Sequence, residues 1–268
     1  MSHNFMGWEK PGHALITGAS SGIGAEFAEQ LAAQGFTPVL VARRKERLEQ
    51  LAASLTAKYG TASEVIVADL AKRDDIVRVA EHIRGMHDLD VLINNAGFGK
   101  GGGTFENVDL QEQIDTIEVH NMAPVIITRQ ALPGMRGHGR GVIIFTASLS
   151  AFLPSPYCGL YSPTKAFLVS LAEVLSLETL HTDIRIQVLC PGFTHTEFHD
   201  VSKVLKEWKA TLPGFMFGST SDVIRESLTG ARKRKTVVIP GLLNKLSVRI
   251  TPKRMMLRYF DFIRAYSE

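Results

Sequence analysis

The stretch His13-Ala-Leu-Ile-Thr-Gly-Ala-Ser-Ser-Gly-Ile-Gly24 joins a short apolar run, a glycine-rich turn and the start of a helical pattern. Glycine lets a backbone turn tightly and approach a phosphate, and the free amides at a helix N-terminus favour negative charge. Glycine spacing alone is a weak signal, but strand, turn and helix follow here in the order that a dinucleotide site requires. The predicted pyrophosphate loop comprises Gly18, Ser20, Ser21, Gly22, Ile23 and Gly24.

On both sides of the turn and onward along the chain, short apolar runs alternate with segments whose apolar residues recur at the helical period. Such alternation requires crossover connections, which form right-handed βαβ units of a parallel sheet. We therefore expect an α/β fold of Rossmann type, a doubly wound seven-stranded parallel sheet with helices on both faces. The expected strands are His13-Thr17, Pro38-Ala42, Glu64-Ala68, Val91-Asn94, Gly141-Thr146, Ile184-Leu189 and Thr236-Ile239. The expected helices are Ile23-Gln34, Lys45-Lys58, Asp74-Arg84, Leu110-Leu132 and Tyr161-Leu180.

The bulk composition fits one globular domain. With 268 residues, 45% hydrophobic and 21% charged, we expect a dinucleotide-binding and catalytic domain over residues 1–240, with a substrate loop at about 192–220. Two cysteines, Cys158 and Cys190, are too few for a disulfide framework, and no Cys/His cluster predicts a metal site. No signal-peptide pattern or membrane-length apolar run is present, so we expect a cytoplasmic protein.

Residues 241–268 are predicted to form a basic, amphipathic C-terminal extension. The region 231–268 holds ten Lys or Arg and two acids, although the whole chain has a net charge of only +3. Apolar residues such as Leu257, Phe260 and Ile263 lie between these basic residues. This pattern is typical both of a helix packed on a protein partner and of a peripheral membrane helix. We favour a partner or a solvated extension over membrane contact, and expect a homo-oligomer and no nucleic-acid partner.

The end of the second predicted strand indicates which cofactor is bound. About 20 residues after the glycine loop, a site for NAD offers an acid to the ribose hydroxyls. This chain has Arg43 and Arg44 there instead. A guanidinium binds a 2′-phosphate through charge-assisted hydrogen bonds, whereas a carboxylate repels it. The sequence therefore favours NADP(H), although a solvated helix start also accounts for basic residues at this point.

The candidate catalytic residues lie in the second half of the chain. Tyr161 and Lys165 are four residues apart, which places both side chains on one face of a helix. A phenol has a pKa of about 10, and a nearby ammonium and an oxidised nicotinamide are expected to lower it. Such a tyrosine donates a proton to a carbonyl or accepts one from an alcohol. Ser148 has a hydroxyl suited to bonding the substrate oxygen, and Ser150 competes for that role.

These motifs, together with Asn94-Asn-Ala-Gly97, resemble the short-chain dehydrogenase/reductase family over roughly Pro11 to Ile239. The resemblance implies an NADP(H)-dependent oxidoreductase that interconverts a carbonyl and a secondary alcohol, as a carbonyl reductase does. The interval between serine and tyrosine in the family matches Ser148. Asn121 resembles the fourth catalytic residue of the family, which supports a proton path to the lysine.

The resemblance also implies further contacts with the cofactor. They are assigned to Asp69, Leu70, Asn95, Ala96, Gly97, Tyr161, Lys165, Pro191, Gly192, Thr194 and Thr196. Apolar residues after Pro191 suggest an apolar small-molecule substrate, although such loops are also hydrophobic in order to exclude water. These residues are Phe193, Phe198, Trp208, Phe215 and Met216.

Several alternatives bear on these assignments. A non-catalytic NADP(H)-sensing or scaffold protein on the same fold is expected to lose the tyrosine or the lysine, and this chain keeps both. His195 and His199 do not follow the order of a zinc protease, so we expect a substrate-side loop there. His120 is expected to pack or to face solvent. Pro163 is tolerated only in a first helical turn, so a helix is predicted to begin near Tyr161.

Overall fold

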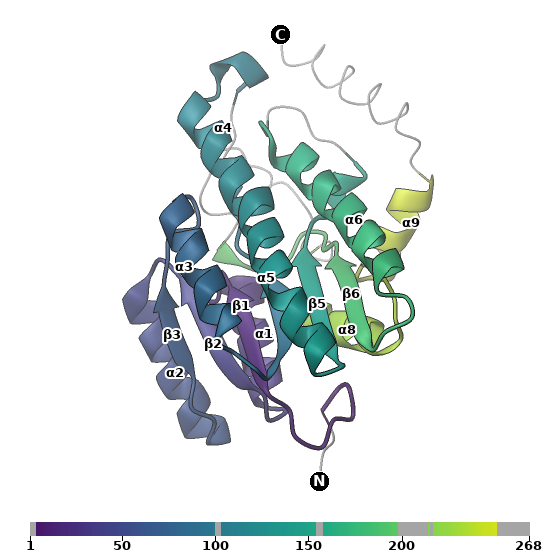
Figure 1. The fold of residues 1–268 in the computed structure, drawn as a ribbon. Coiled ribbons are helices and arrows are strands. Elements are labelled where there is room, and N and C mark those ends of the chain that lie inside the picture. Colours follow the sequence, from purple (N-terminus) through teal and green to yellow (C-terminus); the bar gives the residue numbers. More distant parts are fainter. Residues whose placement is uncertain (1–3, 100–102, 154–157, 198–213, 215–216, 251–268) are drawn as a thin grey trace.

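Seven parallel strands form one sheet in the order β3-β2-β1-β4-β5-β6-β7 (Figure 1). The computed structural model describes residues 4–99, 103–153, 158–197, 214 and 217–250. The strands are β1 His13–Thr17, β2 Thr37–Ala42, β3 Glu64–Val67, β4 Leu89–Asn94, β5 Gly141–Thr146, β6 Ile184–Leu189 and β7 Val237–Val238. The doubly wound Rossmann prediction is confirmed. The predicted tail beyond residue 250 and most of the predicted substrate loop lie outside the described residues.

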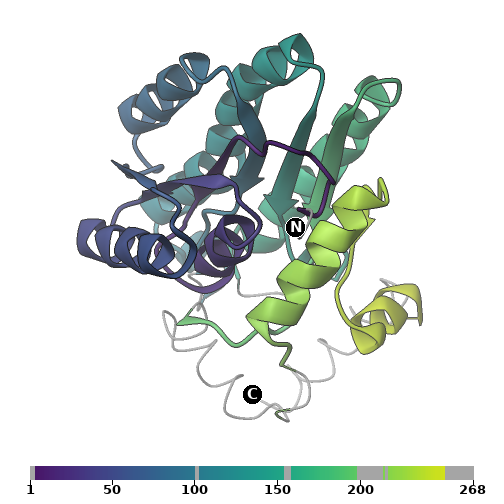
Figure 2. The same ribbon diagram turned by 90° about the horizontal axis from the view of Figure 1, so that it is seen from below.

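Helices cover both faces of the sheet (Figure 2). One layer holds α3 Arg73–Arg84, α5 Ala123–Gly137 and α6 Tyr161–Glu178, and the other holds α1 Gly22–Ala32, α2 Lys45–Tyr59 and α8 Thr220–Arg232. Successive residues of a strand point to opposite faces, so Leu15 packs in the core of the first layer and Ile16 in the core of the second. The structure adds α8 and α9 Leu242–Ile250 to the predicted helices.

The strand order creates a switch point beside β1. The chain runs from β1 outward through β2 to β3 and then returns to the other side of β1 as β4. The loops that follow β1 and β4 therefore leave the sheet in opposite directions. Ligands of open α/β sheets bind in the crevice that this divergence leaves at the carboxyl ends of the strands. All the predicted site residues that follow strands lie at these carboxyl ends.

The predicted helix Leu110–Leu132 is not continuous, which corrects the expectation. It consists of α4 Leu110–Ile117, a π-helical turn Glu118–Met122, and α5. Pro124 explains the break, because proline has no amide to donate to the carbonyl four residues earlier. The amide of Ala123 bonds the carbonyl of Glu118 instead, five residues back. Such turns occur frequently at functional sites.

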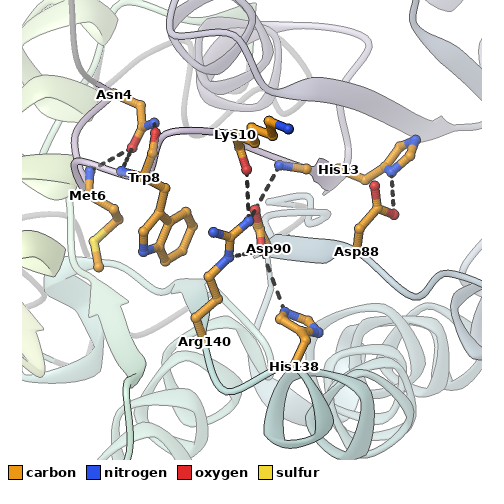
Figure 3. A network of polar contacts seen from close by, with 10 residues as sticks. Asn4, Met6, Trp8, Lys10, His13, Asp88, Asp90, His138 and Arg140 are labelled. Carbon is orange, nitrogen blue, oxygen red and sulfur yellow. Dashed lines mark hydrogen bonds and ion pairs between the residues drawn. The ribbon is translucent and has the colours of Figure 1, made fainter.

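An ion pair anchors the N-terminal segment at the amino ends of the strands (Figure 3). Asp90 in β4 is fully buried and accepts bonds from Nε and Nη2 of Arg140 at 2.8 and 2.7 Å. The Gly12 amide donates to the same carboxylate at 2.7 Å. Arg140 also donates to the Lys10 carbonyl and lies over the Trp8 ring, 4.7 Å from its centroid. Residues before β1 are thereby tied to the start of β4.

Replacing Arg140 with Met is expected to lower the free energy of unfolding by about 2 to 3 kcal/mol. The Gly12 amide remains, but the buried Asp90 carboxylate loses both of its guanidinium bonds. Urea denaturation measures the change. Arg225→Met is the control, because Arg225 pairs with the exposed Asp222 and its loss should cost less than about 1 kcal/mol. Equal effects of the two substitutions would contradict the role given to Asp90.

Candidate active site

The glycine loop is held against the end of β4. Gly18 has a φ of +68°, a conformation that other residues rarely adopt. A Cβ on Gly24 would lie 2.3 Å from the Gly18 carbonyl oxygen, so the first turn of α1 closes on the loop only with glycine there. Asn95 Nδ2 donates to the Thr17 carbonyl at 3.1 Å. The two loops of the switch point thus frame the N-terminus of α1, where phosphates bind.

The side chains of the two arginines after β2 contact different loops. Arg44 Nη2 donates to the hydroxyls of Ser20 and Ser21 at 2.9 and 2.6 Å, so it lies directly on the glycine loop. Arg43 points the other way, with Nη1 4.0 Å from Asp69 Oδ1 and two thirds of its side chain exposed. The predicted residues that follow β1, β2 and β3 are therefore joined by contacts of their side chains.

Two further charged residues near the glycine loop, Glu197 and Arg47, were not predicted. Glu197 accepts hydrogen bonds from Arg47 at 2.7 Å and from Arg44 at 3.2 Å, and these bonds lower the pKa of its carboxyl. The neighbouring Thr196 lies against the glycine loop, 3.1 Å from where a Cβ on Gly22 would be. The loop after β6 thus contacts both the glycine loop and the start of α2. Arg47 lies three residues after Arg44, in the first turn of α2, and no spacing in the sequence connects either arginine with Glu197.

The predicted catalytic residues meet at the ends of β5 and α6. Helix α6 begins at Tyr161 with Pro163 in its first turn, as predicted. The side chain of Ser148, which follows β5, is hydrogen-bonded to that of Tyr161. Lys165 Nζ donates to the Thr146 carbonyl at 2.9 Å and lies 5.6 Å from the centroid of the Tyr161 ring. One group therefore combines a phenol, a hydroxyl and an ammonium.

Burial controls the protonation of this group. Desolvation raises the pKa of Tyr161 to about 12, although the Ser148 hydrogen bond lowers it. Desolvation also lowers the pKa of Lys165 to about 8. Burial penalises the phenolate more than the protein groups around it favour it, whereas the lowering expected beside an oxidised nicotinamide stays a prediction. At neutral pH Tyr161 keeps its proton and Lys165 keeps its charge, which suits proton donation to a carbonyl.

The π-helical turn directs two adjacent side chains inward. Asn121 is buried and its Nδ2 donates to the Thr164 carbonyl at 3.0 Å. Its role in a proton path stays a prediction. His120 is fully buried and its ring meets that of Tyr161 edge to face, with centroids 5.8 Å apart. The sequence pattern did not predict this contact between His120 and the catalytic tyrosine.

The loop after β6 is fixed on both sides. The Pro191 carbonyl accepts from the Leu149 amide at 3.0 Å, next to Ser148. Gly192 packs on α9, where a Cβ would lie 2.8 Å from the Asn244 side chain. Thr194 is buried and its hydroxyl donates to the Gly192 carbonyl. The predicted nicotinamide-side loop therefore lies beside the catalytic group.

The donors fit a bound dinucleotide. A Cβ on Gly97 would lie 3.3 Å from Lys165 Nζ, so the loop with Asn95 and Ala96 passes close to the catalytic lysine. The helix N-terminus suits a pyrophosphate, and the arginines suit a further phosphate at the far end. The Leu70 side chain is buried in the core cluster that also contains residues of α3, and its contact with the cofactor stays a prediction.

Within the described ranges, no three His, Cys, Asp or Glu side chains are grouped so that they would hold a metal ion. The helices described in those ranges include none with the length and apolarity needed to cross a membrane.

Comparisons with known proteins identify the family. The sequence profile of the short chain dehydrogenase family matches residues 12–205. The very-long-chain 3-oxoacyl-CoA reductase of Anas platyrhynchos is 35% identical over 194 residues, which cover 71% of this chain and 62% of that protein. The match thus spans less than two thirds of that relative.

Solved structures agree with this assignment. A short-chain dehydrogenase from Sphingobium yanoikuyae in complex with NADPH has a TM-score of 0.80 and 34% identity, covering 87% of this chain and 88% of the other. The bulky-bulky ketone specific alcohol dehydrogenase from Comamonas testosteroni has a TM-score of 0.77 and 30% identity, covering 96% and 93%. The chain belongs to the short-chain dehydrogenase family, whose members are oxidoreductases that use a nicotinamide dinucleotide.

Proposed function

We propose that this protein is an NADP(H)-dependent oxidoreductase that reduces a ketone to a secondary alcohol and catalyses the reverse reaction. The observation that carries the proposal is the contact of Tyr161 with Ser148 beside Lys165, together with Arg43 and Arg44 after β2, where Arg44 lies on the glycine loop. The catalytic group supplies the proton chemistry, and the arginines supply a site for a 2′-phosphate.

In the proposed mechanism, the ketone oxygen accepts hydrogen bonds from the Tyr161 and Ser148 hydroxyls. The hydride would come from the nicotinamide of a bound cofactor in reduction and would return to it in oxidation. Ser148 stabilises the negative charge that develops on the oxygen, and Tyr161 transfers its proton there. The Lys165 ammonium offsets the negative charge left on the phenol oxygen, and it would also hold the nicotinamide ribose of a bound cofactor. In oxidation, the same groups act in the reverse order.

We propose a bulky, apolar ketone as the substrate class. Phe193 and Phe217 pack with ring centroids 5.5 Å apart on the loop beside the catalytic group, and Phe98 lies on its other side against His120. The Anas relative is named for a very-long-chain oxoacyl compound and the Comamonas structure for bulky ketones, which supports a large substrate here.

A substrate screen tests the proposed function. NADPH oxidation is followed by absorbance with aryl ketones of graded size, 3-oxoacyl thioesters and steroids, and with a sugar ketone as the polar control. Turnover that rises with the apolar size of the ketone is expected. Binding of NADPH without turnover of any carbonyl or alcohol would contradict the proposal and favour a cofactor-sensing protein.

Replacing Arg43 with Ala is expected to raise the KM for NADPH about tenfold or more and to leave that for NADH nearly unchanged, since about 1.4 kcal/mol corresponds to a factor of ten. Arg44→Ala is the matched comparison. It should weaken both cofactors, because Arg44 also holds Ser20 and Ser21 in the glycine loop. Steady-state kinetics with each cofactor measure the effects. Equal losses for both cofactors in Arg43→Ala would show that Arg43 acts on structure alone.

The value of kcat/KM for NADPH is expected to fall as pH rises through about 8. Burial lowers the pKa of Lys165 to about 8, so the ammonium is present below that pH and is lost above it. Because kcat/KM reports the pKa values of the free enzyme, a pH profile of this parameter measures the titration. Lys165→Arg should remove the fall, since arginine stays charged. A parent profile that is flat from pH 6 to 9.5 would contradict the assignment.

We also propose a homo-oligomer, built on an apolar stripe of α4 and α6. The stripe consists of exposed side chains at helical spacing, namely Leu110, Ile114, Ile117, Phe167, Val174 and Leu177. The two helices are in contact, and a contiguous exposed apolar surface usually marks a protein interface. Light scattering of Ile114→Lys is expected to show a smaller particle than the parent, and equal masses would contradict the proposal.

A further inference from the structure

His120 links two parts of the catalytic site through its two ring nitrogens. Nε2 accepts a hydrogen bond from the Phe98 amide at 3.0 Å, in the loop that follows β4. Nδ1 lies 3.0 Å from the hydroxyl oxygen of Thr164, in the first turn of α6. The side chain is completely buried, and a Cβ on Gly97 would lie 3.2 Å from Nε2 and 3.3 Å from Lys165 Nζ.

These partners determine the tautomer of the ring. A backbone amide only donates, so Nε2 must be the unprotonated nitrogen and Nδ1 must carry the hydrogen. Nδ1 therefore donates to Thr164 Oγ1, and the Thr164 hydroxyl in turn donates to the Tyr161 carbonyl at 2.9 Å. The chain of bonds runs without interruption from the loop after β4 to the first residue of α6, and every donor in it has an acceptor.

We propose that His120 is a neutral positioning residue for the reaction, which sets the place of Tyr161 by fixing the first turn of α6 through Thr164. The inference rests on the proposed function. It differs from a proton-transfer role, because protonation of Nε2 would remove the acceptor of the Phe98 amide. The charged or titratable groups that face the ring are Lys165 and Tyr161, both on α6. Burial and then the Lys165 charge hold the pKa of His120 well below its usual range.

The bond to Thr164 can be removed from either side, which permits a double-mutant cycle. In His120→Asn, the side-chain amide falls near Nδ1 and keeps a donor for Thr164. In His120→Gln, the terminal oxygen falls near Nε2 and keeps only the acceptor for Phe98. Thr164→Val keeps the shape of the side chain and removes the hydroxyl. His82→Asn, at an exposed histidine paired with Glu64, is the control that is expected to leave kcat unchanged.

The expected result is a selective loss of kcat. His120→Gln and Thr164→Val should each lower kcat for the best ketone about 10- to 100-fold, as a small misplacement of a reacting group does, and the double variant should be no slower than the worse single one. His120→Asn should stay within about threefold of the parent. KM for NADPH should change little. Additive losses, or losses of NADPH affinity and thermal stability in parallel with kcat, would show that His120 only packs.

A second measurement needs no turnover and separates this inference from the proposed function. Long-range ¹H–¹⁵N correlation spectra of the parent protein are expected to show His120 with a protonated Nδ1 and an unprotonated Nε2, unchanged from pH 5.5 to 8. A ring that titrates in this range, or one with its hydrogen on Nε2, would overturn the inference even if ketones are reduced. The predicted spectrum in a protein without turnover would instead contradict only the proposed function.

Discussion

Replacing Tyr161 with Phe is expected to lower kcat by about 10² to 10⁴, the range that one general acid contributes. Only the hydroxyl is lost, so the edge-to-face contact of the ring with His120 remains. The substrate oxygen then has no proton donor, whereas the glycine loop and the arginines are unaffected. Stopped-flow traces under single-turnover conditions measure the chemical step, and fluorescence titration with NADPH checks that cofactor affinity stays close to that of the parent.

The matched control is Tyr59→Phe. The Tyr59 hydroxyl donates a hydrogen bond to Glu29 at the surface, far along the chain from the catalytic group. Loss of this hydroxyl should leave kcat unchanged. If Tyr161→Phe retained most of the parent activity on the best ketone, another group or a water molecule would have to donate the proton, and the proposed mechanism would fail.

The sheet was predictable because its signals are local. Each strand is an apolar run bounded by turn residues, and β1, β5 and β6 have the predicted limits. The π-helical turn was missed because the helical period continues across it. Pro124 has no amide hydrogen, so it changes the backbone hydrogen bonds of the helix. It does not change the spacing of the apolar side chains, which is the signal that the sequence shows.

The proximity of two catalytic candidates was predictable because both lie on the same helix. Tyr161 and Lys165 are fixed by helical spacing, whereas Ser148 was preferred to Ser150 because of the family resemblance. Burial raises the pKa of Tyr161 through packing from several segments that a motif does not contain, and the sequence alone did not predict that contribution. His120 illustrates the same limit, since its two partners are 22 and 44 residues away along the chain.

The predicted binding site for the cofactor phosphate contains one residue that the sequence predicted and one that it did not. Arg44 was predicted from its position after a strand, whereas Glu197 is 153 residues from its arginine partner, and no sequence spacing connects the two. Charge alone also did not indicate that Arg43 and Arg44 would point to different loops. The direction of each side chain depends on the turn that ends β2, which is why the two substitutions are expected to affect NADPH and NADH differently.

Replacing Ser148 with Ala is expected to lower kcat for reduction by about 10² to 10³, as the loss of one oxyanion donor does. The hydroxyl is hydrogen-bonded to Tyr161 and would face the ketone oxygen as its charge develops. Because that bond also lowers the pKa of Tyr161, its loss should raise the pH at which the oxidation rate reaches half its maximum. Measuring kcat against pH in both directions tests the two effects together.

Ser150→Ala is the control for this last prediction. Ser150 competed with Ser148 for the catalytic role on sequence grounds, but in the structure its backbone amide donates to Ser148 Oγ at 3.2 Å. That bond survives the loss of the Ser150 hydroxyl, so kcat should stay within about threefold of the parent, well short of the loss of an oxyanion donor. The assignment would be reversed if Ser150→Ala lost a hundredfold or more in kcat while Ser148→Ala lost little, because the hydroxyl nearest the developing charge would then be that of Ser150.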